Sequence, residues 1–175
     1  TGFRHEVNER ISTILSRAGL NETVTFSFMH PDQLQKLLFA ENDPVCKAVP
    51  ILNPITEDFP LMRTTLIPTL MDVLVRNQAV KNASVGIYEI APVYRPKQLP
   101  LTELPEQEDC VAGLLYGQRT DNSWPGKAEN YDFYDVKGMV EAVLEGLGIQ
   151  ADLEVSDFAP LHPGKAARFV KDGKV

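Results

Sequence analysis

The first candidate site is a short acidic loop followed by an arginine. Glu57 and Asp58 precede Arg63, and a helical pattern begins directly after the arginine. The first turn of a helix has free N–H groups that attract anions, and an arginine beside it adds a forked donor. The group could therefore bind an anion. An ion-paired clamp, in which Arg63 holds Glu57 and Asp58 and positions the loop, is the favoured interpretation because the three charges are near neighbours in sequence.

Two further groups of cations stand near predicted strands. Arg95 follows an apolar strand pattern, and such a strand-end arginine is most simply an exposed side chain. Lys165 and Arg168 belong to a basic run that could contact RNA phosphates. In a strand-turn segment, a run of this kind is more often a solvated edge that discourages sheet aggregation.

Composition excludes several classes of function. The net charge of −7 and the isoelectric point of about 5.0 argue against a dedicated nucleic-acid-binding surface, which needs a basic excess. No stretch is long and apolar enough to span a membrane. Cys46 and Cys110 are isolated, as expected in the reducing cytoplasm. The histidines have no metal-ligand spacing, so we expect no metal site; they are His5, His30 and His162.

Hydrophobic periodicity predicts the elements that must position these groups. Helices are expected over residues 3–18, 64–78 and 133–147, with a short helix opening at Pro31. Strands are expected over residues 23–29, 48–52, 85–94, 109–116, 151–155 and 167–170. In the first strand, Val24, Phe26 and Phe28 should be buried and the intervening hydroxyl residues exposed.

The order of these elements predicts an α+β fold. A long polar loop joins strands 85–94 and 109–116, which must therefore pair antiparallel, and helices do not alternate regularly with strands. We expect a mostly antiparallel sheet with helices packed on one face. The 175 residues suit one domain, residues 1–175. The absence of an initiator Met and the Asp172-Gly173 turn near the end predict a fragment of a longer chain, truncated at its C-terminal end.

Four motifs carry a resemblance to a known family. The stretch from Asn53 to Leu70 reads N-P-x-x-E-D-x-x-x-M-R-T-x-L-x-P-x-L, and three further segments follow it in order: residues 86–95, 131–138 and 162–164. Together they resemble the core domain of the bacterial phenylalanyl-tRNA synthetase beta chain. The resemblance covers most of the chain from Asn53 onward, and it implies the fold of a class II aminoacyl-tRNA synthetase core.

The same resemblance implies a degenerate nucleotide site. Arg95 stands where the class II motif 2 arginine binds the ATP α-phosphate. Lys97 occupies the place of the acidic residue expected after it, Pro96 intervenes, and no counterpart of motif 3 appears before Val175. Arg95 is thus expected to be a vestige, with no catalytic residue and no cofactor in this domain.

In the family, this domain supports an (αβ)₂ assembly. The resemblance implies a non-catalytic partner of the alpha chain, which joins phenylalanine to tRNA(Phe) with ATP and Mg²⁺ in the cytoplasm. Leu66 and Leu70 are the interface candidates, provided that they face outward, and exposed apolar surface could also drive self-association. Two alternatives stay open: an ATP-binding adenylating domain that uses Arg95, and a tRNA-binding module that uses Lys165 and Arg168.

Overall fold

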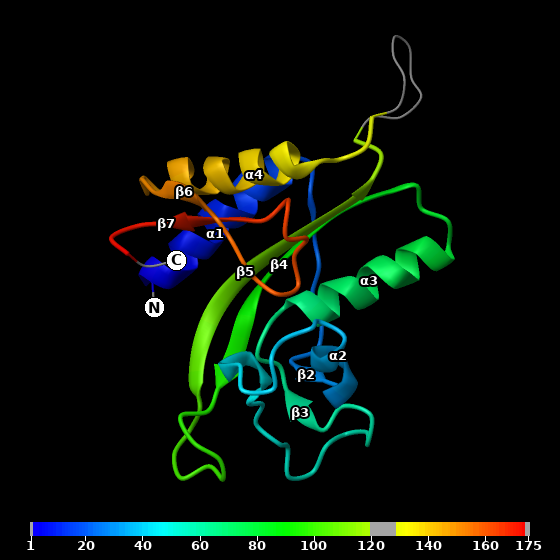
Figure 1. Cartoon of the computed structure of the whole chain (residues 1–175), viewed down its shortest axis with the longest axis vertical. Helices are drawn as coiled ribbons and strands as arrows, with labels where there is room; N and C mark the ends of the chain where they lie inside the picture. The colour runs from blue at the N-terminus through cyan, green and yellow to red at the C-terminus, as the bar shows by residue number, and fades with distance from the viewer. Residues whose placement is uncertain (1, 120–128, 174–175) are drawn as a thin grey trace.

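The computed structural model describes residues 2–119 and 129–173 (Figure 1). Its helices are α1 (Gly2–Arg17), α2 (Pro31–Gln35), a 3₁₀ turn (Pro44–Cys46), α3 (Ile67–Ala79) and α4 (Phe133–Gly146). Its strands are β1 (Asn21–Glu22), β2 (Phe28–Met29), β3 (Leu61–Met62), β4 (Ser84–Arg95), β5 (Glu106–Gly117), β6 (Asp152–Val155) and β7 (Ala167–Val170). The content is α+β, as predicted.

The long hairpin of β4 and β5 is the centre of the fold. The two strands pair antiparallel over their whole length, from Ser84 opposite Gly117 to Arg95 opposite Glu106. β1 adds a short parallel edge beside Ile87 and Tyr88, which gives the strand order β1-β4-β5. The pairing predicted across the long loop is confirmed. β6 and β7 form a separate antiparallel pair.

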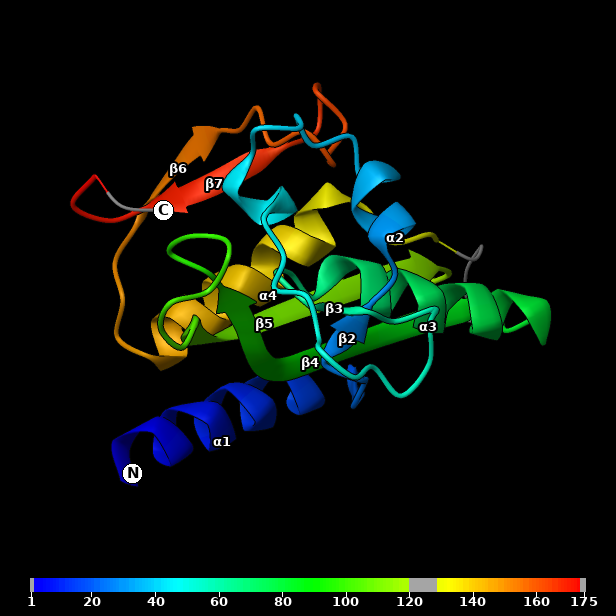
Figure 2. The same cartoon turned by 90° about the horizontal axis from the view of Figure 1, so that it is seen from below.

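Helices cover both faces of this hairpin, so the prediction that they pack on one face is wrong. On one face, Leu15 of α1 packs with Tyr88 of β4, and α4 contributes Met139 and Val143. On the other face, Leu70 and Leu74 of α3 pack on β4 and β5; their buried partners on β4 are Val85 and Ile87. Figure 2 shows α1 and α3 on opposite sides of the hairpin. Successive strand residues point to opposite faces, and both faces of β4 are apolar.

The helix termini explain where α4 and α1 begin and end. The carboxylate of Asp132 accepts hydrogen bonds from the N–H groups of Tyr134 and Asp135, at 2.7 and 3.2 Å, and so caps α4. Gly19 follows α1 with a φ of 93°, the left-handed conformation that ends many helices.

A smaller layer of β2, β3 and α2 lies below α3 in Figure 1, beside the lower part of the hairpin. Here two strand predictions are wrong. Of residues 48–52, only Pro50 forms a bridge, with Leu61, and the N–H groups of Ile51 and Met62 donate to Pro60 and Val49 on either side of it. Residues 23–29 contain only one short strand, β2 at Phe28–Met29, because β1 ends at Glu22, just before them.

α3 begins at Ile67, three residues later than predicted. The hydroxyl of Thr64 donates to the carbonyl oxygen of Val45 at 2.6 Å, which ties this residue to the chain before it instead of the helix after it. Pro68 stands in the first turn of α3, where its missing N–H costs no intrahelical hydrogen bond.

Candidate functional site

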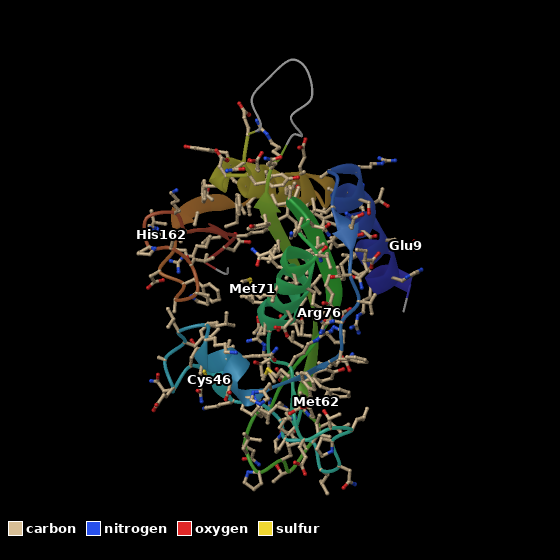
Figure 3. The ribbon with its side chains drawn as sticks, turned by 90° about the vertical axis from the view of Figure 1, so that its right-hand side faces the viewer. Glu9, Cys46, Met62, Met71, Arg76 and His162 are labelled. Atoms are coloured by element: carbon tan, nitrogen blue, oxygen red, sulfur yellow. The ribbon has the colours of Figure 1, made fainter. Side chains whose placement is uncertain are left out.

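Arg63 is buried in the centre of the molecule. Only 1% of the residue is exposed, although arginine is almost never buried without a partner. Its Nη1 lies 2.9 Å from Oε1 of Glu89 on β4, and its Nε donates to the carbonyl oxygen of Pro92 at 2.9 Å. Arg63 follows Met62, which Figure 3 labels at the lower end of α3.

The predicted clamp between Arg63, Glu57 and Asp58 is therefore wrong. Glu57 and Asp58 lie in an exposed turn, and the partner of Arg63 is Glu89 instead. The reason is topological. The chain between the acidic turn and Arg63 runs through β3 into the interior, so the two neighbouring carboxylates stay in solvent while the guanidinium does not.

Glu89 is the second buried charge, with 2% of the residue exposed. Besides Arg63, its carboxylate accepts from the backbone N–H of Thr25 at 3.2 Å and from the Thr25 hydroxyl at 2.8 Å. Among the described residues, every buried side-chain nitrogen and oxygen has a hydrogen-bond partner. Removing one member of a buried pair leaves the other uncompensated, at a cost of about 3–5 kcal/mol.

The Arg63–Glu89 pair fills a fork in the sheet, which is the place where residues 23–27 diverge from β4. At the start of the fork, the N–H of Thr23 donates directly to the carbonyl oxygen of Tyr88 on β4, at 2.7 Å. Further along, the backbone of Arg63 lies between the two segments: its N–H donates to the carbonyl oxygen of Ser27, and its carbonyl oxygen accepts from the N–H of Tyr94, both at 2.9 Å. The gap between these two points contains Glu89, Thr25 and the guanidinium.

This arrangement turns the apolar side of residues 23–27 outward. Val24 is 91% exposed and Phe26 is 81% exposed, while Thr25 faces the buried pair. The prediction that Val24 and Phe26 are buried is therefore wrong. One sequence signal pointed to the outcome: Glu89 interrupts an apolar strand, and a buried carboxylate needs polar partners.

Leu66 and Leu70 do not face outward either. Each is 2% exposed, and Leu70 packs against the β4–β5 hairpin. They were interface candidates only if they faced outward, and this condition is not met because both belong to the core. α3 presents Met71 and Val75 to solvent; each directly follows a buried leucine and so lies about 100° further around the helix.

Arg95 ends β4 as predicted and is partly exposed. Its Nε lies 3.3 Å from Oε2 of Glu108 on the return strand, and the neighbouring Lys97 lies 3.4 Å from Glu103. Each cation thus has a carboxylate beside it, which reduces the local positive potential available to a phosphate.

The basic residues near the end of the chain are also partly offset. Arg168 on β7 lies 3.2 Å from Oε2 of Glu154 on β6, and Lys165 is exposed in the preceding loop. These two residues do not form a continuous basic face, because the acidic partner of Arg168 sits directly opposite it across the β6–β7 pair.

Two further ion pairs and two cysteines have shifted pKa values without forming a reactive site. The Arg4 guanidinium donates to Asp109 and lowers the pKa of that carboxyl. Arg119 is bonded to Asp135, which raises the pKa of the guanidinium. Burial raises the pKa of both thiols, Cys46 and Cys110, so neither is activated as a thiolate nucleophile.

No group of three potential metal ligands comes together among residues 2–119 and 129–173. Figure 3 shows His162 and Glu9, the ion-pair partner of His5, on opposite sides of the molecule. In the same described part of the chain, no helix is both long enough and apolar enough to cross a membrane.

Comparison with protein families gives a match over residues 3–175. The matching family model is described as the phenylalanyl tRNA synthetase beta chain CLM domain. Among curated proteins, the phenylalanine–tRNA ligase beta subunit of Geobacter metallireducens is 37% identical over 166 residues, which covers 93% of this chain and 20% of the relative. That of Carboxydothermus hydrogenoformans is 34% identical and covers 96% of this chain and 21% of the relative.

The chain therefore spans about a fifth of the length of these curated relatives. Among solved structures, pyrrolysyl-tRNA synthetase from Desulfitobacterium hafniense superposes with a TM-score of 0.61 at 20% identity, covering 87% of this chain and 50% of that one. At this identity the likeness concerns the fold, which is that of a class II synthetase core, as expected from the sequence.

Proposed function

This chain belongs to the family of phenylalanyl-tRNA synthetase beta chains, and we propose that it serves there as a non-catalytic assembly domain. Its partner is the alpha chain, which ligates phenylalanine to tRNA(Phe) with ATP and Mg²⁺ in the cytoplasm. Residues 1–175 act as one domain in this role, and contact with tRNA(Phe) comes through the parent complex.

The single observation that carries the proposal is the outward orientation of Val24 and Phe26. Large apolar side chains at this level of exposure are disfavoured in water. Here they are kept outward by a buried ion pair, Arg63–Glu89, whose desolvation is itself costly. An exposed apolar surface that the fold stabilises in this way is typical of a subunit interface, because a partner subunit covers the apolar centre of such an interface.

The ATP-binding alternative has weaker support. A phosphate site needs an uncompensated cation or a set of convergent donors, whereas Arg95 and Lys97 each lie beside a glutamate. We therefore assign no catalytic residue and no cofactor to this domain. The tRNA-binding alternative meets the same objection at Arg168, which is paired with Glu154.

The test places an aspartate at the proposed interface. In the full beta chain, Val24→Asp and Phe26→Asp should each weaken binding of the alpha chain by at least about tenfold, because a carboxylate would be desolvated on association. Val155→Asp is the matched control: Val155 is similarly exposed but lies on β6. Equal affinity of all three variants for the alpha chain, measured by titration calorimetry, would remove the assignment of this surface.

A second measurement separates the alternatives. In a titration of the beta chain with ATP and Mg²⁺, the Arg95→Ala substitution should not change the binding of ATP. Binding of tRNA(Phe) should not change in Arg168→Ala. Loss of ATP binding in Arg95→Ala would establish the ATP-binding alternative in place of the assembly role. Loss of tRNA(Phe) binding in Arg168→Ala would establish the tRNA-binding alternative.

A further inference from the structure

We propose that Arg63 and Glu89 are positioning residues that fix the register of residues 23–27, and thereby decide which face of this segment meets a partner. The inference rests on the proposed function only for the identity of that partner. Neither residue can touch the partner directly, because 1% of Arg63 and 2% of Glu89 is exposed.

The side-chain pattern of the segment allows two opposite orientations. Residues 23–28 read Thr-Val-Thr-Phe-Ser-Phe, so a shift of one residue exchanges a hydroxyl face for an apolar face. The hydrophobic effect favours the orientation that buries Val24 and Phe26. The structure has the other orientation, so a specific interaction must outweigh this preference.

Three anchors at alternate positions select the observed register. The N–H of Thr23 donates to Tyr88, the N–H and hydroxyl of Thr25 donate to Glu89, and the carbonyl oxygen of Ser27 accepts from Arg63. A shift of one residue would place a valine or phenylalanine side chain against the buried carboxylate. That side chain has no donor, so Glu89 would lose a hydrogen bond in a site without solvent.

The geometry of Arg63 explains why an arginine occupies this place. Its side chain reaches acceptors in three directions: Pro92 on β4, Glu89 on the same strand, and Thr25 on the segment. A lysine ammonium is a single nitrogen and cannot span these positions, whereas the guanidinium is a planar fork with five donors. The guanidinium thus joins the segment to β4 beside the carboxylate of Glu89.

Hydroxyl-radical footprinting tests the inference in the full beta chain without the alpha chain. Phe26 and Phe3 are equally exposed, at 81% and 80%, and so should oxidise at similar rates. In the double variant Arg63→Met/Glu89→Leu, which replaces the pair by apolar groups, the Phe26 rate should fall at least threefold relative to Phe3. An unchanged ratio with Tyr88 still protected would overturn the inference.

Tyr88, which is fully buried, reports whether the variant stays folded. If Tyr88 oxidises in the double variant, that variant is not folded, and the ratio of the Phe26 and Phe3 oxidation rates is measured in Thr25→Val instead. This variant keeps the ion pair but removes the hydroxyl donor to Glu89. There too the Phe26 rate should fall relative to Phe3, and an unchanged ratio would overturn the register role.

Association with the alpha chain gives the second readout. The folded double variant should bind the alpha chain at least tenfold more weakly, although both substitutions are internal. If the footprint changes and the affinity does not, the register role stands and the assignment of this face to the alpha chain fails. The two proposals can therefore fail separately.

Discussion

The hydroxyl oxygen of Tyr88 lies 2.8 Å from Oγ of Ser12, and this hydrogen bond joins the central strand β4 to helix α1. A second serine of the same helix, Ser16, lies 3.0 Å from the same oxygen. Tyr88 is fully buried, so this hydroxyl satisfies two helix side chains from within the core. The contact fixes α1 at the place where the chain turns toward the fork.

Tyr88→Phe should therefore destabilise the fold. Removing a buried hydroxyl whose partners stay in place costs about 1–2 kcal/mol, because the serine hydroxyls lose a hydrogen-bond partner. Urea denaturation followed by circular dichroism measures the change. Tyr94→Phe is the matched control on the same strand, and it should change the free energy of unfolding by less than about 0.5 kcal/mol. Equal effects of the two substitutions would contradict the role of the Tyr88 hydroxyl.

Gly117 is the position where the hairpin least tolerates a side chain. Its φ is 78°, and a Cβ there would lie 1.9 Å from the carbonyl oxygen of Ala83. Gly117→Ala should cost more than about 2 kcal/mol, because the clash is with backbone and the conformation is strained. Gly138→Ala on α4 meets open space and should instead stabilise by about 0.5–1 kcal/mol. Thermal unfolding of the two variants distinguishes these opposite signs.

The ion pair in the fork should show strong coupling between its members. Arg63→Met alone or Glu89→Leu alone leaves one buried charge and should cost about 3–5 kcal/mol. The double variant should cost clearly less than the sum of the two, because no unpaired charge remains. A double-mutant cycle from urea denaturation measures this coupling. Additive costs would mean that the pair contributes no specific interaction.

Asp109 should make stability depend on pH in the acid range. The hydrogen bond from Arg4 lowers the pKa of this carboxyl, and Asn8 contributes a further hydrogen bond. A lowered folded-state pKa adds stability above the unfolded-state value of about 3.9, and that stability is lost as pH falls through the folded-state pKa. Unfolding of Asp109→Asn should therefore show a weaker loss of stability below about pH 4. An identical pH profile would exclude Asp109 as a contributor.

The regular elements could be predicted because their signals are local. The β4–β5 pairing follows from two predicted strands joined by a loop, and α4 follows from a 3.6-residue pattern of apolar residues. The class II fold was accessible from the motifs that the chain shares with its family. These features need no knowledge of distant contacts.

The predictions that were wrong concern features that are not local, because each depends on a residue far away in the sequence. Arg63 was assigned to carboxylates five and six residues away, but its partner is 26 residues further along the chain. The burial of residues 23–27 was inverted for the same reason, since their polar side faces Glu89. Leu66 and Leu70 were interface candidates on the condition that they face outward, but both are buried, and Leu70 packs against the β4–β5 hairpin. Local patterns determine periodicity; the choice of face is made by contacts between separate segments.

The fork also bears on the order in which the protein acquires its structure. Synthesis proceeds from the N-terminus, so residues 23–27 leave the ribosome well before Glu89 has been made. During that interval the segment lacks the carboxylate that holds Thr25, and we expect Val24 and Phe26 to collapse onto nearby apolar side chains. A stalled chain that ends before β4 should then protect Phe26 from oxidation, and release of β4 should expose it. Residues 23–27 would thus reach their final orientation only after β4 has been made.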